Sequence, residues 1–177
     1  MTTDGRPFLI RLAQPQDRNL IIENINRVCA EQIYLESDCF VPTPAWETML
    51  ADPGVLSLPH LLAIAELDGT IAGHVRCSPG GFGHKDYHVA DVGIALIEPY
   101  REKGIGSRLL EYAIAWASQA GYLKLTATVF ETNTRALRLF RRCGFEREGR
   151  RARQFQIQGR YIDEVLLARF MDTDARS

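Results

Sequence analysis

Residues 92–110, VGIALIEPYREKGIGSRLL, join an apolar segment to a glycine-spaced basic turn and then to a helical pattern. The apolar segment is typical of a central strand covered on both faces, and it ends at Pro99, which cannot donate to a ladder. The pattern that follows predicts a helix from Gly104 to a stop at Gly121. Because a helix that starts directly after a strand exposes unpaired N–H groups and a partial positive charge, this junction favours an anion.

The composition of the turn indicates which anion. Gly104 and Gly106 have no Cβ, so a phosphate can approach the backbone closely, while Arg101, Lys103 and Arg108 add positive charge beside it. We therefore predict a pyrophosphate site, although two glycines in such a turn also suit a purely structural role. The turn lacks the lysine of a P-loop, and a leucine stands where a Rossmann fingerprint needs its third glycine.

Length and charge limit the wider possibilities. The chain has 177 residues, which suits one domain over residues 1–177 with an ordered core over about 7–171. Lys and Arg total 21 against 22 Asp and Glu, so the net charge of -1 gives no reason to expect nucleic acid or a charged membrane as partner. Arginines recur between positions 135 and 153, where a solvated helix face running into a polar strand is the simpler interpretation.

The cysteines indicate a reducing compartment. Cys29, Cys39, Cys77 and Cys143 form no CxxC pair and lie at no metal-ligand spacing from a histidine, so we expect free thiols and no metal. No apolar run is long enough for a signal peptide or a membrane span. The sequence therefore predicts a cytoplasmic protein.

The remaining pattern predicts an α/β (α+β) fold. Two hairpins are indicated by the turn pairs Asp68-Gly69 and Gln158-Gly159, and Thr43 is a candidate helix cap. The expected elements are a strand at 7–14, a helix from Pro15 through 20–35, a short helix at 44–52, a hairpin at 60–78, the strand at 87–97 and helix from 104, a strand at 122–130, a helix at 132–144, and strands at 145–158 and 160–170. This order gives a mixed, mostly antiparallel sheet of about seven strands with helices on both faces.

Two motifs together resemble one family. Arg101, Gly104 and Gly106 fill the pattern [QR]-x-x-G-x-[GA], and the sequence at this point is similar to the acetyl-coenzyme A signature of the GNAT (GCN5-related) N-acetyltransferase superfamily. Residues 133–145, NTRALRLFRRCGF, resemble that family's second motif, a helix that starts at an asparagine and ends in Gly-Phe. The likeness covers most of the chain and is weakest over about 36–60. It implies the GNAT fold.

The resemblance also implies where acetyl-coenzyme A would bind as cosubstrate. The strand before the signature splays from its neighbour in this family, so its backbone would pair with the pantetheine arm, and an N–H near Leu96 would polarise the thioester carbonyl. Asn133 resembles the family asparagine that contacts the coenzyme, and it is equally suited to capping a helix. The expected coenzyme-binding residues are Ile94, Ala95, Leu96, Arg101, Glu102, Lys103, Gly104, Ile105, Gly106, Ser107, Asn133 and Phe140.

The catalytic acid and base are less evident from the sequence. Many family members carry a tyrosine where this chain has Phe140, which has no proton to give. A thiol pKa of about 8.5 allows thiolate to leave unassisted. Tyr161 is one candidate acid, and an ordinary strand tyrosine is the simpler interpretation. Asp91 and Glu131 are the candidate bases because they are the carboxylates nearest in sequence to the expected cleft, although either side chain suits a structural role.

Two hypotheses about function follow. The first is an N-acetyltransferase that moves the acetyl group of acetyl-coenzyme A to a primary amine, by direct attack in a ternary complex. The amine would be a small amine, an amino acid or a protein N-terminus. The second is a catalytically weak coenzyme-binding sensor or regulatory module of the same fold. Acidic residues at 31, 36 and 38 are suited either to a cationic amine or to a solvated helix end. Edge strands make a homodimer plausible.

Overall fold

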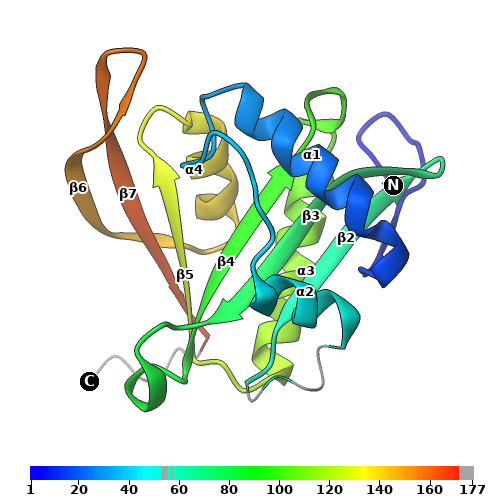
Figure 1. Ribbon diagram of the computed structural model, residues 1–177, viewed down its shortest axis with the longest axis horizontal. Coiled ribbons are helices and arrows are strands. Elements are labelled where there is room, and N and C mark those ends of the chain that lie inside the picture. Colours follow the sequence, from blue (N-terminus) through cyan, green and yellow to red (C-terminus); the bar gives the residue numbers. More distant parts are fainter. Residues whose placement is uncertain (53–55, 57, 172–177) are drawn as a thin grey trace.

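The computed structural model describes residues 1–52, 56 and 58–171, and its elements follow the order that the sequence predicts (Figure 1). They are β1 (Leu9–Leu12), the 3-10 turn η1 (Pro15–Asp17), α1 (Arg18–Ala30), α2 (Pro44–Ala51), β2 (Leu61–Leu67), β3 (Thr70–Pro79), η3 (Gly83–Lys85), β4 (Val89–Leu96), η4 (Glu98–Tyr100), α3 (Ile105–Gln119), β5 (Lys124–Phe130), α4 (Thr134–Arg142), β6 (Glu146–Ile157) and β7 (Arg160–Phe170).

The strands form one sheet in the order β1-β2-β3-β4-β5-β7-β6. Every neighbouring pair is antiparallel except β4 and β5, which confirms the predicted mixed, mostly antiparallel sheet. Figure 1 shows α1 and α2 on the front face and α3 behind the sheet. Each face has its own core, because Leu109 and Ala113 of α3 belong to one buried cluster and Ile21 and Trp46 of α1 and α2 belong to another.

The parallel contact between β4 and β5 is short. The two strands pair only at Val89, Ala90 and Asp91, after which β4 continues to Leu96 beside β3 alone. β5 runs on to Phe130 beside β7. The two central strands therefore separate toward their carboxyl ends, as the family resemblance implies.

Both predicted hairpin turns are present and have the backbone that their residues suggest. Asp68 and Gly69 have φ values of 49° and 72°, and Gln158 and Gly159 have values of 49° and 77°. Thr43 caps α2 by accepting a hydrogen bond from the N–H of Trp46 (3.2 Å). These local signals are read correctly from the sequence because each depends on neighbours in the chain.

Two expectations about boundaries differ from the structure. The first helix ends at Ala30 rather than continuing to residue 35, because Gln32 adopts a left-handed backbone with φ 52° that stops a helix. Residues 1–6 lie before the expected core, yet Thr2 is buried and the Thr3 N–H donates to the Lys103 carbonyl (3.1 Å). The last residues of the expected domain, 172–177, lie outside the described residues.

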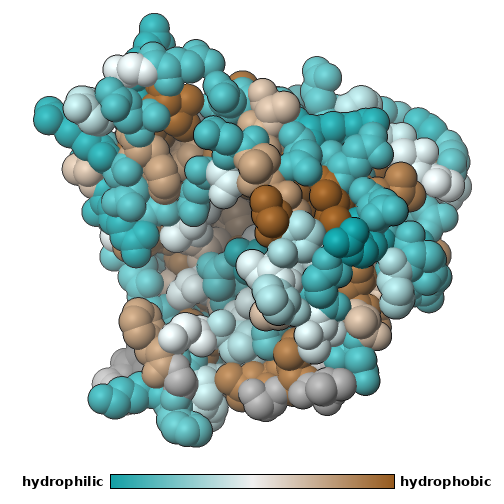
Figure 2. Space-filling model, in the orientation of Figure 1, coloured by the Kyte–Doolittle hydropathy of each residue, from teal (hydrophilic) through white to brown (hydrophobic). Residues whose placement is uncertain are grey.

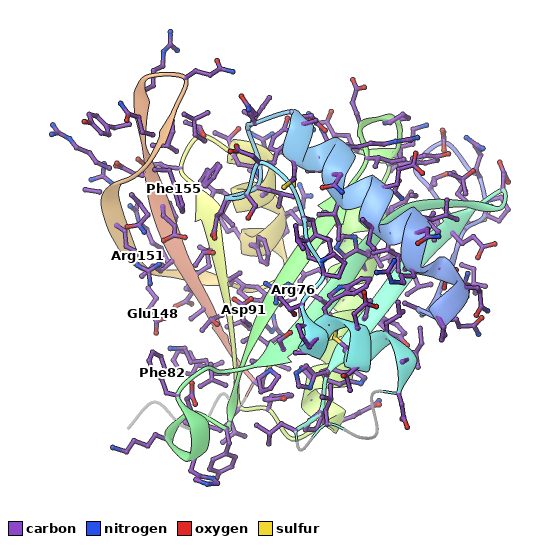
Figure 3. All side chains as sticks on the ribbon, viewed as in Figure 1. Arg76, Phe82, Asp91, Glu148, Arg151 and Phe155 are labelled. Carbon is purple, nitrogen blue, oxygen red and sulfur yellow. The ribbon has the colours of Figure 1, made fainter. Side chains whose placement is uncertain are left out.

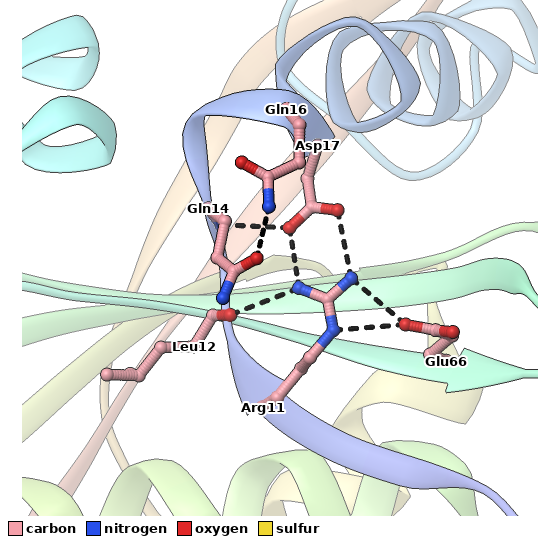
Figure 4. Close-up of polar contacts among 6 residues, drawn as sticks. All are labelled: Arg11, Leu12, Gln14, Gln16, Asp17 and Glu66. Atoms are coloured by element: carbon pink, nitrogen blue, oxygen red, sulfur yellow. Dashed lines mark hydrogen bonds and ion pairs between the residues drawn. The ribbon is translucent and has the colours of Figure 1, made fainter.

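An ion pair between the half-buried Arg11 and the buried Asp17 ties β1 to the start of α1 (Figure 4). The Arg11 guanidinium donates to both carboxylate oxygens of Asp17 (2.6 and 2.9 Å) and also to Glu66 on β2 (3.0 Å). Asp17 also accepts from the Gln14 N–H (2.8 Å), so its carboxylate closes the turn η1. The pair holds the pKa of Asp17 below its usual range.

We expect Asp17→Asn to lower the free energy of unfolding at pH 7 by about 1–3 kcal/mol, because the half-buried Arg11 loses one of its two carboxylate partners and the buried site loses a charge-assisted hydrogen bond. Since the folded-state pKa of Asp17 is lowered, the stabilisation is present above about pH 4 and is lost as the pH falls through that lowered pKa. Urea unfolding at pH 7 and at about pH 2 measures both values. The exposed pair of Arg6 and Asp68 provides a control, since Asp68→Asn should cost under about 1 kcal/mol. An Asp17→Asn cost independent of pH would contradict the electrostatic explanation.

Candidate active site

A cavity of about 520 Å³, here called the main cavity, lies where β4 and β5 separate. Its walls come from residues 91–95 of β4, residues 128–130 of β5 and the inner side of α4. Residues 34–37 and 40, from the loop between α1 and α2, cover it. In Figure 2 the surface is hollowed in this region, between the β6–β7 hairpin and α1. The main cavity thus lies over the gap between the two strands, and residues of α1, α2 and β3 complete its lining.

Strand register decides which side chains face the main cavity. Arg76 stands opposite Gly93, and Asp91 stands opposite both Ser78 and Thr126, so all five share one face of the sheet. Arg76 and Asp91 form an ion pair (2.9 Å), and Figure 3 shows both side chains over the middle of the sheet. A side chain at Gly93 would approach the Arg76 guanidinium at 3.1 Å, so the glycine leaves room for the arginine.

The backbone of β4 is open along the gap. The Ile97 N–H donates to the Ala72 carbonyl of β3 (3.2 Å), so strand alternation points the N–H groups of Ile94 and Leu96 toward the gap. Ile94 and Ala95 line the main cavity. An extended ligand in the gap would find hydrogen-bond donors along this edge.

The predicted anion turn has the required backbone. Gly104 is the N-cap of α3 with φ 80°, a conformation that favours glycine. The first bond of the helix runs from the Arg108 N–H to the Gly104 carbonyl (3.3 Å), so the amides of residues 105–107 precede the ladder. A Cβ at Gly106 would lie 3.3 Å from Leu139 and 3.5 Å from Leu96. Gly106 therefore also allows α3 to pack closely against β4 and α4.

The charges around this turn differ from the sequence-based expectation. Arg101, Lys103 and Arg108 are all ion-paired, with Glu31 (2.5 Å), Asp4 (3.5 Å) and Glu111 (2.9 Å) respectively. Arg101 is the most buried of the three, with 11% of its side chain exposed. Its Nε donates to the Leu96 carbonyl (2.8 Å), and its guanidinium stacks on the Tyr34 ring (4.7 Å). Arg101 thus connects the end of β4 to the loop after α1 and does not point freely toward a ligand.

A second cavity of about 490 Å³, the basic cavity, lies beside the turn. Arg27, Arg101 and Arg135 line it, one from each of α1, the turn and α4. Tyr34 lines both this cavity and the main cavity. The two spaces are therefore neighbours. Glu31 and Glu98 also line the basic cavity, so its arginines lie beside carboxylates.

Asn133 and Phe140 both line the main cavity. The Asn133 side chain accepts a hydrogen bond from the Ala136 N–H (3.0 Å) and so caps α4. Phe140 is buried and packs edge-on against Phe145, with ring centroids 5.0 Å apart. Asn133 therefore caps α4 and also lines the main cavity.

The structure brings only one of the three candidate catalytic residues to the main cavity. Asp91 lines it, whereas Glu131 and Tyr161 are not among its lining residues. Glu131 is paired with arginines of β6 at 3.5 and 3.6 Å. Tyr161 stands near the tip of the β6–β7 hairpin with 62% of its surface exposed and carries the Arg153 guanidinium over its ring. Glu131 is near the expected cleft in sequence and Tyr161 is a candidate acid on the last hairpin, but neither side chain lines the main cavity.

The cavity also contains groups that the sequence analysis did not assign. Glu36 lines it from the loop and accepts a hydrogen bond from Thr128 Oγ1 on β5 (3.2 Å). Burial raises the pKa of the Glu36 carboxyl, and the negative charges of Glu164 and Asp91 add to that effect. His74 on β3 is buried against the same space, and burial with the nearby Arg76 charge lowers its pKa to about 4. The acidic cluster at 31–38 was the only available signal for Glu36.

Neither a metal site nor a membrane helix is found within residues 1–52, 56 and 58–171. No group of three or more His, Cys, Asp or Glu side chains in this part of the chain is placed to hold a metal ion. None of its helices has the length and apolar character that a membrane crossing requires. All four cysteines are free, and burial raises the pKa of Cys77 to about 12.

An open strand edge, a helix start suited to phosphate and a cavity between them together suit acyl transfer from a coenzyme thioester. A family model described as the acetyltransferase (GNAT) family matches residues 22–145. The chain therefore belongs to the GNAT family of acetyltransferases, and the predicted acyltransferase class is confirmed.

Relatives agree with this assignment over nearly the whole chain. L-amino acid N-acetyltransferase AaaT of Escherichia coli (strain K12) is 28% identical over 167 residues, covering 92% of this chain and 97% of the relative. N-alpha-acetyltransferase RimI of Mycobacterium tuberculosis is 32% identical, covering 90% and 91%. The structure of yncA from Salmonella typhimurium, determined with its cofactor acetyl-CoA, has a TM-score of 0.84 at 20% identity, covering 97% and 98%. That last likeness confirms the predicted fold.

We expect the buried His74, which lines the main cavity, to make the free energy of unfolding decrease in moderate acid. Its folded-state pKa of about 4 lies below the unfolded value of about 6.5, so the unfolded chain binds the proton more tightly. Stability is therefore complete above about pH 6.5 and falls by up to about 3 kcal/mol as the pH approaches 4. His74→Gln should remove this slope. Urea unfolding of both proteins at pH 7, 5.5 and 4 measures it, and equal slopes would contradict the assignment to His74.

Proposed function

We propose that this protein is an N-acetyltransferase that moves the acetyl group of acetyl-coenzyme A to a primary amine. The observation that carries the proposal is the separation of β4 from β5 after Asp91, directly beside the glycine turn that starts α3. A pantetheine arm fits the open edge of β4, because extended backbone can pair there. A pyrophosphate fits the amides of residues 102–107, since Gly104 and Gly106 leave them accessible.

The transfer step places few demands on the protein beyond orientation. Acetyl-coenzyme A supplies an activated acyl group and a thiolate leaving group. The Leu96 N–H, which points toward the gap, is suited to donate to the thioester oxygen as negative charge develops on it, a contribution of about 3 kcal/mol. Phe140 is packed so that it excludes water from the inner wall of the main cavity. The amine attacks in a ternary complex, and no covalent acyl-enzyme is needed.

The acceptor proposed is a small amine, an amino acid or a protein N-terminus. The relatives described above are named for L-amino acids and for N-alpha acetylation, which supports amine acceptors of this size. Residues of the loop between α1 and α2 line the main cavity and residues of the coenzyme turn do not, which supports a separate route for the amine on the loop side. The four free cysteines support a cytoplasmic location, where thiols stay reduced.

A coenzyme-release assay tests the proposal. Purified protein with acetyl-coenzyme A and separate panels of L-amino acids, amino acid amides, short peptides and polyamines should release free thiol in the presence of at least one amine. Mass spectrometry should then find one acetyl group on that amine. Coenzyme binding without turnover on any panel would contradict the proposal.

We expect Gly104→Glu to weaken coenzyme A binding at least about tenfold, because the new carboxylate would repel the pyrophosphate. Gly121→Glu is a matched control at the other end of the same helix. The two glycines have φ values of 80° and 84°, and a Cβ at either has no neighbour closer than 3.6 Å, so backbone strain is similar. Calorimetric titration with coenzyme A measures both affinities. Equal losses for the two variants would show that strain, not charge at the turn, is responsible.

Phe140 favours a second candidate function, a coenzyme-binding module with slow or no turnover, because a phenylalanine cannot protonate the leaving sulfur. Phe140→Tyr should leave coenzyme affinity within about twofold and raise kcat if protonation limits turnover. A stopped-flow thiol assay compares the two proteins. If wild-type turnover is fast and the tyrosine adds nothing, unassisted thiolate departure is sufficient and this second function is excluded.

A further inference from the structure

Residues of the loop between α1 and α2 line the main cavity, the basic cavity and a third cavity beside the β6–β7 hairpin. Glu31 and Tyr34 line the basic cavity, and residues 34–37 and 40 line the main cavity. A third space of about 250 Å³, the outer cavity, lies between this loop and the tip of the β6–β7 hairpin. The main and outer cavities share Leu35, Glu36, Ser37 and Phe130 as wall residues. Glu36 therefore stands where the two spaces meet.

Three carboxylates interact at this place, and two of them are neutralised. Asp91 is paired with Arg76 (2.9 Å), and the buried Glu164 is paired with Arg151 (2.6 Å). Glu36 accepts a hydrogen bond from Thr128 (3.2 Å), and its carboxyl shares a hydrogen bond with the Glu164 carboxyl. Within the described part of the chain, no arginine, lysine or histidine nitrogen is recorded within 4.0 Å of the Glu36 carboxylate. The three carboxyls at this place are therefore matched by two arginines, and Glu36 is the one without a cationic partner among the described residues.

We propose that Glu36 binds the ammonium group of the acceptor and receives its proton, so that the acceptor is a cationic primary amine. The inference rests on the proposed transferase function and adds to it the residue that selects the acceptor. An ammonium at this position would replace the missing cation, and a hydrogen bond between two charged groups is about twice as strong as a neutral one. Glu36 is joined by Thr128 to β5, one wall of the gap where the thioester would lie.

The charge state of the carboxylate supports this role. Glu36 is an exposed residue, yet partial burial of its carboxyl raises the pKa, and the charge and hydrogen bond of Glu164 and the Asp91 charge raise it further. A raised pKa makes a carboxylate a better proton acceptor. The other charged or titratable groups facing this site are Cys29 on α1, His60 before β2, His74 and Arg76 on β3, Asp91 on β4, Arg151 on β6, Glu164 on β7, and Tyr34 and Asp38 on the loop.

The proton and electron balance of the step is complete. One ammonium proton moves to the Glu36 carboxylate and then to solvent, which leaves a free lone pair on nitrogen. That lone pair forms the new N–C bond at the thioester carbonyl carbon, and the C–S bond breaks with its electron pair on sulfur. The attacking nitrogen then loses its extra proton, which reaches the thiolate through water. The products are the N-acetyl amine, coenzyme A thiol and one proton.

The outer cavity indicates what the rest of the acceptor is like. It is lined by Gln32, Gln156 and Gln158 together with Phe155 and Ile157. Amide groups beside an aromatic ring suit a substituent that is polar or moderately apolar. An acidic substituent is disfavoured, because Asp38 and Glu36 both line this space. The proposed acceptor class is therefore a cationic primary amine without an acidic side group.

Binding of L-methioninamide, a monocationic primary amine, tests the inference without requiring turnover. Calorimetry with coenzyme A-saturated protein should show at least about tenfold weaker binding to Glu36→Gln, which keeps the side-chain shape and an oxygen for Thr128 but removes the charge. Glu36→Asp should retain part of the affinity. N-acetyl-L-methioninamide, which lacks the ammonium, should bind wild type and Glu36→Gln equally. Glu148→Gln, an exposed carboxylate paired with Lys124 and outside all three cavities, is the matched control.

Kinetics then separate this inference from the proposed function. With an amine that the wild type acetylates, Glu36→Gln should raise KM at least about tenfold, lower kcat, and remove the acidic limb of the kcat/KM profile that reflects the raised Glu36 pKa. Coenzyme A affinity should be unchanged, which shows that the variant is folded. Wild-type amine affinity and kcat/KM in Glu36→Gln would overturn the inference and leave the transferase function standing. If wild type turns over no amine, the transferase function fails, and the L-methioninamide titration decides the ammonium site by itself.

Discussion

The site depends on the limited pairing of β4 with β5. Three residue pairs hold the strands together, and beyond Asp91 the inner edge of β4 has no strand beside it. Unpaired backbone groups at the centre of a sheet are costly unless water or a ligand satisfies them. α3 begins just beyond this edge, with Gly104 in a left-handed conformation, so its unpaired amides open at the end of the same gap. The short pairing of β4 with β5 thus leaves room for an extended ligand, and the start of α3 places the candidate anion site at the end of that gap.

A buried arginine connects that gap to the loop that covers it. Arg101 donates to the Leu96 carbonyl at the end of β4 and to both carboxylate oxygens of Glu31, 70 residues earlier in the chain. It also stacks on Tyr34, which faces two of the cavities. Bidentate geometry fixes orientation as well as distance. Arg101 therefore holds the loop between α1 and α2 in position, and this loop places Glu36 beside the gap between β4 and β5.

The sequence predicts the parts of this arrangement that local chemistry determines. Hairpin turns, the Thr43 cap, the glycine turn and the Asn133 cap each depend on residues a few positions apart. The partner of Arg101 and the position of Glu36 depend on how an irregular loop crosses the sheet, which no periodic pattern encodes. Glu131 and Tyr161 show the converse. Glu131 is close in sequence to the cleft but pairs with arginines of β6, and Tyr161 lies near the tip of the β6–β7 hairpin, so neither lines the main cavity.

The arginine-rich segment from 135 to 153 takes part in the same charge arrangement. Arg147 and Arg150 contact Glu131, Arg150 also contacts Asp163, and Arg151 contacts the buried Glu164. An uncompensated charge at Glu164 would be expensive, so Arg151 must remain beside it. Had Arg151 reached Glu36 instead, the cavity would hold an internal ion pair and little attraction for an amine. Asp91 and Glu164 each have an arginine partner, whereas Glu36 has hydrogen bonds with Thr128 and Glu164 but no cationic partner among the described residues. An acceptor that brings a positive charge is the simplest way to provide that partner.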